Sequence, residues 1–212
     1  MSPDLSRLFE DGREIATEIG TATLRLRDAG ELLVTSGRVV ACDPFASPDA
    51  EPFTRAVPPG RYPVVLSVAH FEDDDQRVAA AMLRLGGGRP VSWELALVPG
   101  DEPAELAEGE VFGYGVDSGT GCFMDEEAAR TLTQKMDEDE DYSEEMMDEM
   151  DKTYVDTWSW ANFVLNDAGA NFVAFSAGVG DGLYASYFGL DAEGRAVSLV
   201  TDFSLFELEE MS

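Results

Sequence analysis

The sequence predicts an α+β, β-rich fold in which antiparallel sheets pack as a sandwich or an open barrel, with one helical acidic insertion. Short runs of alternating apolar and polar residues recur along the chain, and Gly, Pro and Asp separate them. A pattern with the period of a helix stands out in one region, after Glu126. The 212 residues, 44% of them hydrophobic, are enough to bury a sizeable core. We therefore expect a single globular domain over residues 1–212.

The first half of the chain is expected to form strands joined by irregular connections. Residues 1–20 are interpreted as a short, partly helical lead-in, and Asp43-Pro44 ends a strand because proline lacks a backbone donor. Strands are predicted at residues 21–27, 31–42, 61–71, 76–85 and 91–99. The third and fourth of these form a hairpin with a charged tip, and the fifth continues them as an antiparallel meander.

The second half predicts one helix followed by further strands. Ala129, Leu132 and Met136 fall on one helical face, and Asp125 is placed to cap the helix and to favour its N-terminal dipole. Strands are predicted at residues 110–116, 171–177, 182–191 and 195–203. The last two form a hairpin, in which Gly194 can supply a positive φ.

The chain carries a formal net charge of −29, and much of it gathers in one block. Residues 137–151 hold ten carboxylates in fifteen positions, which is typical of a flexible acidic segment, either disordered or a frayed helix. The block partly resembles a calcium-binding loop, but Tyr142 stands where that loop needs glycine. We expect a basic protein partner and no nucleic acid, because this charge repels phosphates. Adaptation to salt is the alternative explanation of the acidity.

The sequence shows no pattern for a membrane span, a secretion signal or a cofactor. No run reaches the roughly 18 apolar residues that a membrane helix needs, and the first twenty residues carry charges throughout. We therefore expect a cytoplasmic protein with no membrane partner. Cys42 and Cys122 have no Cys or His at zinc-ligand spacing and are expected to be buried thiols. No metal and no cofactor are predicted.

Two glycine-rich turns are the preferred region for a ligand site. The first is FGYGVDSGTGCFMD at residues 112–125, and the second is SAGVGDG at residues 176–182. Both follow strands, so they could meet at one rim of a sheet, where carboxylates and close backbone approach could hold a ligand or a divalent ion. The candidate ligand-binding residues are Asp117, Ser118, Thr120, Asp125, Ser176 and Asp181. Asp43 could add a further carboxylate, and ordinary turn chemistry is the alternative explanation of both turns.

Motifs for nucleophilic or nucleotide chemistry are missing from these turns. Neither contains the Gly-Lys-Ser/Thr of a phosphate-binding loop, and neither lies in a strand–helix–strand frame. His70 is the only histidine, and we interpret it as a structural or surface residue at the end of a strand. No catalytic residue is therefore assigned.

Four segments together resemble a bacterial family, domain of unknown function 4241. The segments are GRVVACDPF, PFTRAVPPGRYPVVLSVA, FGYGVDSGTGCFMD and NFVAFSAGVGDGLYASYFGLDAEGRAVSLVTDF. The resemblance extends from about Gly37 to Phe203, and the block at 137–151 is its least similar part. It implies a bacterial origin and a single-domain β-rich fold, and it brings no activity and no catalytic residues.

Two functions from different classes follow. The first is a non-enzymatic cytoplasmic bacterial binding protein, such as an immunity-type protein that neutralises a basic toxin or nuclease. Its basis is the charge together with the lack of a catalytic motif. The alternative is a ligand- or metal-binding enzyme, hydrolase-like, in which carboxylates such as Asp117 and Asp181 act at the two glycine-rich turns.

Overall fold

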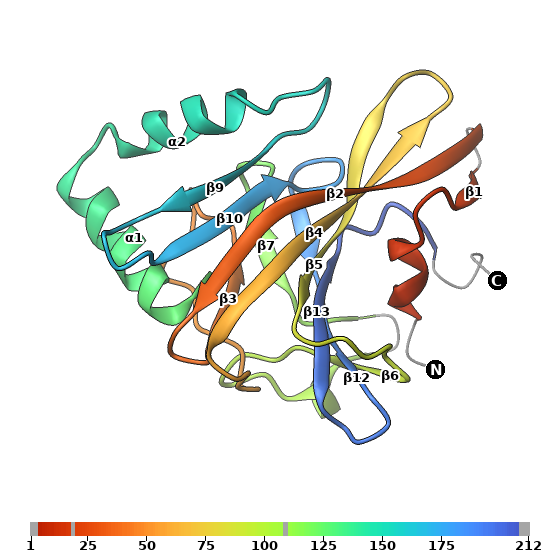
Figure 1. Ribbon diagram of the computed structural model, residues 1–212, viewed down its shortest axis with the longest axis horizontal. Helices are drawn as coiled ribbons and strands as arrows, with labels where there is room; N and C mark the ends of the chain where they lie inside the picture. Colours follow the sequence, from red (N-terminus) through yellow and green to blue (C-terminus); the bar gives the residue numbers. More distant parts are fainter. Residues whose placement is uncertain (1–3, 18–19, 108–109, 208–212) are drawn as a thin grey trace.

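The computed structural model describes residues 4–17, 20–107 and 110–207. These residues form three antiparallel sheets and two α-helices, and the helices lie together on one side of the molecule (Figure 1). The largest sheet contains, in spatial order, β1 (Glu14–Thr17), β2 (Gly20–Val34), β4 (Gly60–Phe71), β5 (Gln76–Arg84), β13 (Ala196–Asp202), β12 (Ser186–Leu190) and β6 (Ser92–Leu95).

A second sheet of four strands packs against the first. Its spatial order is β3 (Val39–Cys42), β8 (Thr120–Asp125), β10 (Asn171–Ser176) and β9 (Trp160–Val164), and a small ribbon pairs β11 (Gly182–Tyr184) with β7 (Tyr114–Val116). The helices are α1 (Glu126–Glu138) and α2 (Tyr142–Asp151), with short 3-10 helices η1 (Leu5–Phe9) and η2 (Pro103–Glu105). None of the helices described is long and apolar enough to cross a membrane.

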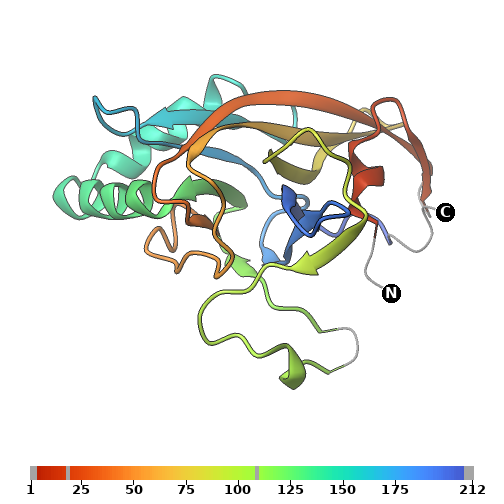
Figure 2. The ribbon, with the colours of Figure 1, turned by 60° about the horizontal axis from the view of Figure 1, so that its bottom comes forward.

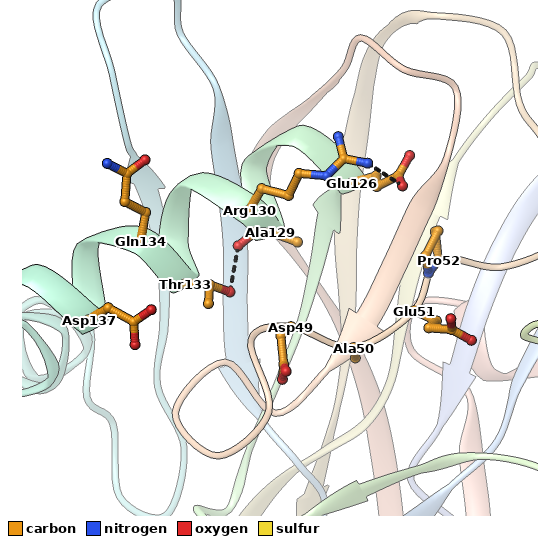
Figure 3. Close-up of a pocket in the computed structure, with 10 residues that line it drawn as sticks. All are labelled: Asp49, Ala50, Glu51, Pro52, Glu126, Ala129, Arg130, Thr133, Gln134 and Asp137. Atoms are coloured by element: carbon orange, nitrogen blue, oxygen red, sulfur yellow. Dashed lines mark hydrogen bonds and ion pairs between the residues drawn. The ribbon is translucent and has the colours of Figure 1, made fainter.

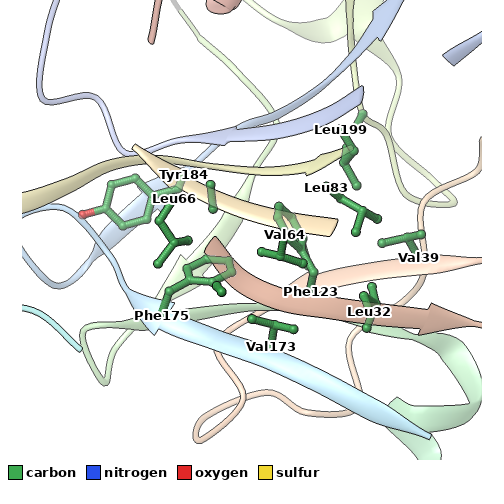
Figure 4. Close-up of a cluster of buried hydrophobic side chains, with 14 of the residues drawn as sticks. Leu32, Val39, Val64, Leu66, Leu83, Phe123, Val173, Phe175, Tyr184 and Leu199 are labelled. Carbon is green, nitrogen blue, oxygen red and sulfur yellow. The ribbon is translucent and has the colours of Figure 1, made fainter. Parts of the chain in front are cut away.

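The main hydrophobic core fills the space between the two larger sheets. The seven-stranded sheet curls into a half-barrel, and the four-stranded sheet covers its apolar face. Side chains from both sheets interdigitate there (Figure 4), among them Leu32, Val64, Leu66, Leu83 and Leu199 from the first and Val39, Phe123, Val173 and Phe175 from the second. The predicted β-rich α+β class with packed antiparallel sheets is confirmed.

The four-stranded sheet is buried on both faces. Alternate residues along its strands point away from the main core and contact the two helices, as Phe172 and Met124 do. The central strands β8 and β10 consequently have no exposed residue, and every residue of β8 is buried. This second core explains why the helices need an apolar face.

The acidic block at 137–151 is helical except at residues 139–141. Met146 and Met150 lie one turn apart, are buried against the four-stranded sheet, and hold α2 in place. Leu132 anchors α1 in the same way, and Asp125 caps α1 by accepting a hydrogen bond from the Glu127 N–H, as predicted. Packing of the methionines therefore outweighs the repulsion that favoured a disordered segment.

The strands in the first half differ from the prediction in several ways, beginning with β1, which lies within the predicted partly helical lead-in of residues 1–20. Residues 20–34 form one long strand with a bulge between Asp28 and Glu31, and a turn at 35–38 breaks the predicted run of 31–42. The predicted meander is wrong: β4 and β5 pair as expected, but β6 pairs with β12 and not with β5. Strand β13 takes the place beside β5 and forms the predicted hairpin with β12, where Gly194 has a φ of 77°.

Candidate functional site

The two glycine-rich turns lie side by side. Strands β8 and β10 pair so that Thr120 is opposite Ser176, and the Ala177 N–H donates to the Gly119 carbonyl at 2.9 Å. A Cβ atom on Gly119 would lie 3.8 Å from the Cα of Gly180. The strand ends therefore bring both turns to one rim of the four-stranded sheet.

Asp43 holds the first glycine-rich turn in place through hydrogen bonds. Its carboxylate is fully buried and accepts hydrogen bonds from the Asp117 N–H at 2.9 Å, the Ser118 N–H at 2.8 Å and the Ser118 hydroxyl at 2.7 Å. It also accepts from the N–H groups of Phe45 and Ala46. Five donors occupy the two carboxylate oxygens, so Asp43 is a structural anchor for the turn rather than a free ligand.

Asp125 lies at the other end of β8, about 17 Å from the turn for a strand of this length. Besides the helix cap, its buried carboxylate accepts from the N–H and hydroxyl groups of both Thr35 and Ser36. Asp125 thus joins the β2–β3 turn to the start of α1. The structure does not bring it to the rim with Asp117.

The hydroxyl groups of the predicted site are also engaged in the fold. The Ser176 hydroxyl accepts from the Ser159 N–H at 2.9 Å, and the Ser118 hydroxyl is bound by Asp43. Thr120 is buried within β8. Gly121, the next residue, has no room for a side chain, because a Cβ would lie 2.6 Å from the Tyr114 hydroxyl.

Asp117 and Asp181 are the predicted residues that point to solvent at the rim. Both are exposed, and two exposed apolar side chains, Val179 and Leu183, accompany them. Four cavities in the described parts of the chain are lined by side chains other than Asp117 and Asp181. The rim is therefore a mixed acidic and apolar surface.

A groove of about 460 Å³ runs along α1 (Figure 3). One wall is the segment 49–52, which follows β3, and the other is the exposed side of α1. Asp49, Glu51 and Asp137 are exposed along the groove and take part in none of the ion pairs found in the described parts of the chain. Glu126, by contrast, is paired with Arg130 at 2.6 Å. The groove therefore has an excess of negative charge.

The acidic groove continues into the acidic helix. Asp137 belongs both to the groove and to the block 137–151, and α1 and α2 stay together on one side of the molecule in two views (Figures 1 and 2). On α2 the exposed residues are Glu144, Glu145, Met147, Asp148 and Asp151. We call the three groove carboxylates (Asp49, Glu51, Asp137) and the four exposed α2 carboxylates the acidic face.

The thiols and the histidine are poorly placed for nucleophilic chemistry. Cys42 and Cys122 are opposed on β3 and β8, both fully buried, with their sulfurs 3.6 Å apart. Burial raises the pKa of Cys122 well above its usual value, which keeps the thiol protonated. His70 is half-buried on β4, and burial, with Arg25 and Arg27 nearby, lowers its pKa. Among the residues described, no group of three or more His, Cys, Asp or Glu side chains is arranged to hold a metal ion.

The sequence predicted that the two glycine-rich turns could meet at one rim, but it did not predict the groove along α1. Asp49 and Glu51 lie in a Pro-rich connection that was interpreted as irregular, and nothing local indicates that it packs along α1. The α2 surface carried a signal in the spacing of Met146 and Met150, which the surrounding carboxylates obscured.

Comparison with known proteins identifies the family of the chain. Residues 32–201 match the model of the family described as "Protein of unknown function (DUF4241)". No curated protein and no solved structure is detectably similar to the chain. The match covers most of the chain, and the protein belongs to this family.

Proposed function

We propose that this protein is a cytoplasmic bacterial binding protein that neutralises a basic partner, in the manner of an immunity protein acting on a basic toxin or nuclease. The acidic face is the binding surface in this proposal. Its carboxylates are exposed, and they stand on a helix and a groove that are already folded. A preformed acidic surface would accelerate association with a basic protein and add little ordering cost.

The observation that carries the proposal is the arrangement of like charges on α2. Glu144 and Asp148 are one turn apart, as are Glu145 and Glu149, and such pairs destabilise a helix by about 0.2–0.5 kcal/mol each. Of these carboxylates, Glu149 pairs with a cation, Lys152. The buried methionines stabilise α2 despite this repulsion. A basic partner would relieve the repulsion, and a neutral partner would not.

The uneven spread of charge favours a partner over adaptation to salt. Residues 137–151 contain none of the 14 Lys and Arg residues of the chain. Exposed arginines lie elsewhere, on the large sheet, as at Arg25, Arg27 and Arg61. Salt adaptation would spread acidity evenly over every face. In this chain residues 137–151 hold ten of the 43 Asp and Glu residues in fifteen positions.

The test is a binding measurement in which charge is removed from α2 alone. Proteins from a bacterial lysate are retained on the immobilised protein at low salt, and a retained basic protein is purified and titrated by calorimetry. We expect the triple variant Glu144→Gln, Glu145→Gln, Asp148→Asn to weaken binding at least about tenfold, with a steep loss of affinity as salt is added. A retained nuclease should also lose its activity in the complex.

The matched control removes three charges from another exposed site. Glu72, Asp73 and Asp74 lie at the tip of the β4–β5 hairpin, and their amides should leave the affinity within about twofold. The proposal fails if no basic protein is retained at low salt, or if both triple variants bind the partner equally well.

The adjacency of the glycine-rich turns supports a second candidate, a ligand- or metal-binding enzyme at the rim. Since Asp43 and Asp125 are occupied by hydrogen bonds, Asp117 and Asp181 are the carboxylates available for this chemistry. A screen of hydrolase substrates and divalent ions tests it. Activity that is lost in Asp117→Asn and Asp181→Asn would support the enzyme, and activity unchanged in both would exclude that assignment.

A further inference from the structure

One cavity of this acidic protein is lined by arginines and by no carboxylate. It has a volume of about 280 Å³ and lies where β5 runs into the loop 85–91, against the edge of η1. Arg84 and Arg89 both line it, and none of its lining residues is Asp or Glu. We call the cavity and these two side chains the arginine corner.

Arg84 and Arg89 are available to a ligand. Both are exposed, and neither takes part in an ion pair within the described parts of the chain. Two other arginines next to the same loop are neutralised, because Arg55 pairs with Glu94 and Arg195 with Asp191. The arginine corner therefore contains two guanidinium groups that form no ion pair within the described parts of the chain.

Ser198 supplies a buried polar group with no partner. It lies opposite Arg84 on β13, is 3% exposed, and lines the cavity. Its hydroxyl makes no hydrogen bond, although a buried unsatisfied group costs about 1–3 kcal/mol. An oxygen atom of a ligand in the cavity would satisfy it.

Gly189 makes room for the base of the cavity. A Cβ at this position would lie 2.4 Å from the Ser198 hydroxyl, 2.8 Å from Pro90 Cγ and 2.9 Å from Trp93 Cζ3. A glycine here allows Ser198, Pro90 and Trp93 to converge. The walls beside them are apolar and include Phe9 and Met82.

Two glycines that line the cavity have backbone N–H groups without a partner among the described residues. The Gly86 N–H donates to the Val197 carbonyl, whereas the N–H groups of Gly87 and Gly88 donate to no group among the residues described. Asp4 lies near the cavity through its hydrogen bond from Ser6, which also lines it. The pKa of Asp4 is lowered, first by Ser6, so this carboxylate is charged and is held by local donors rather than by Arg84 or Arg89.

We propose that the arginine corner binds a small organic phosphate. Two guanidinium groups, two unengaged glycine N–H groups and one unpartnered hydroxyl suit the several oxygens of a phosphate monoester. The aromatic and thioether side chains of the walls suit an apolar or planar organic part of limited size. The site is independent of the acidic face and of the partner proposed for it.

The test is a calorimetric titration with phenyl phosphate at constant ionic strength. We expect saturable binding with one site per chain, and at least about tenfold weaker binding in Arg84→Gln/Arg89→Gln. Arg61→Gln is the matched control, since Arg61 is also exposed and outside the described ion pairs, and its affinity should stay within about twofold. Ser198→Ala should weaken binding several-fold without lowering stability, because it removes an unsatisfied buried hydroxyl.

Three further probes separate the contributions of charge, shape and the apolar part. Inorganic phosphate should bind more weakly than phenyl phosphate, benzoate more weakly still, and phenol not at all. Benzoate binding as tightly as phenyl phosphate would overturn the phosphate assignment. The absence of saturable phenyl phosphate binding, or equal affinity in the double variant and the wild type, would overturn the site itself.

Discussion

The acidic face and the arginine corner are charged regions of opposite sign that are built in different ways. Most of the acidic face comes from one continuous segment, which two buried methionines hold against a sheet. The arginine corner is assembled from β5, its following loop and β13, which come from different halves of the chain. The net charge of −29 for the whole chain is therefore consistent with the acidic face but gives no indication of the arginine corner.

The largest loss of stability is expected at Asp125, which connects α1 to the β2–β3 turn. Asp125→Ala removes the cap of α1 and leaves the N–H groups of Thr35 and Ser36 without their acceptor. We expect a loss of about 3–4 kcal/mol in the free energy of unfolding, measured by urea denaturation. Asp117→Ala, at an exposed carboxylate in the turn before β8, should change it by less than about 0.5 kcal/mol. Equal losses in the two variants would contradict the anchoring role.

A smaller loss of stability is expected when the contact between α2 and the four-stranded sheet is weakened. Met146 is 1% exposed and Met147 is 53% exposed, so adjacent methionines give a matched pair. Met146→Ala should destabilise the protein by about 2–3 kcal/mol through the cavity it leaves, and Met147→Ala by less than about 0.5 kcal/mol. Thermal and urea denaturation measure both. If α2 were a loosely attached segment, the two variants would behave alike.

The base of the arginine corner requires a residue without a side chain at position 189, where the protein has Gly189. Gly189→Ala would force Ser198, Pro90 and Trp93 apart, and we expect a loss of about 2 kcal/mol in the free energy of unfolding. Gly115→Ala is the control, because a Cβ there would meet no atom within 4 Å. A stable Gly189→Ala protein would show that the base of the cavity is less tightly packed than the structure has it.

The same strand that carries Ser198 ends in a pH-sensitive carboxylate. Burial raises the pKa of Asp202 to about 6 from 3.8, so its contribution to stability is present below about pH 4 and is lost as the pH rises through 6. Asp202→Asn cannot ionise. Between about pH 4 and pH 8 it should gain about 2 kcal/mol relative to the wild type, since one pKa unit corresponds to about 1.4 kcal/mol. Urea denaturation at the two pH values measures this difference, and a constant difference would refute it.

The smallest effect tests the repulsion on α2 itself. Asp148→Asn should be about 0.3 kcal/mol more stable than the wild type at low salt, because it removes the like-charge pair with Glu144. Glu144 and Glu145 are left in place, since they lie in the first turn, where the helix dipole favours their charge. The gain should vanish at about 1 M salt. Denaturation at both salt concentrations checks it, and a loss of stability at low salt would mean that Asp148 stabilises the free protein.

Local patterns predicted the local parts of this fold. Alternating residues and a charged tip identified the β4–β5 hairpin, and Asp125 before an amphipathic run identified the start of α1. The meeting of the glycine-rich turns followed from their positions after strands. Whether either turn holds a ligand stays a prediction.

The pairing of strands that are far apart in the sequence could not be predicted from local patterns. The run containing β6 has no feature that distinguishes β12 from β5 as its neighbour, so the meander was the simpler expectation. Arg84 and Ser198 meet only because β13 inserts beside β5. Their chemistry as a pair is therefore invisible until the strand order is known.

The order of strands in the large sheet also has a consequence for protein synthesis. The hairpin of β4 and β5 emerges from a ribosome before the second partner of β5, which is β13, and before the partner of β6, which is β12. Both of these strands lie within residues 186–202. Until they emerge, the nascent chain exposes an unpaired strand edge along β5 and an isolated β6. We therefore expect the sheet to close only after residues 186–202 have left the ribosome, which makes the growing chain a substrate for chaperones that shield strand edges.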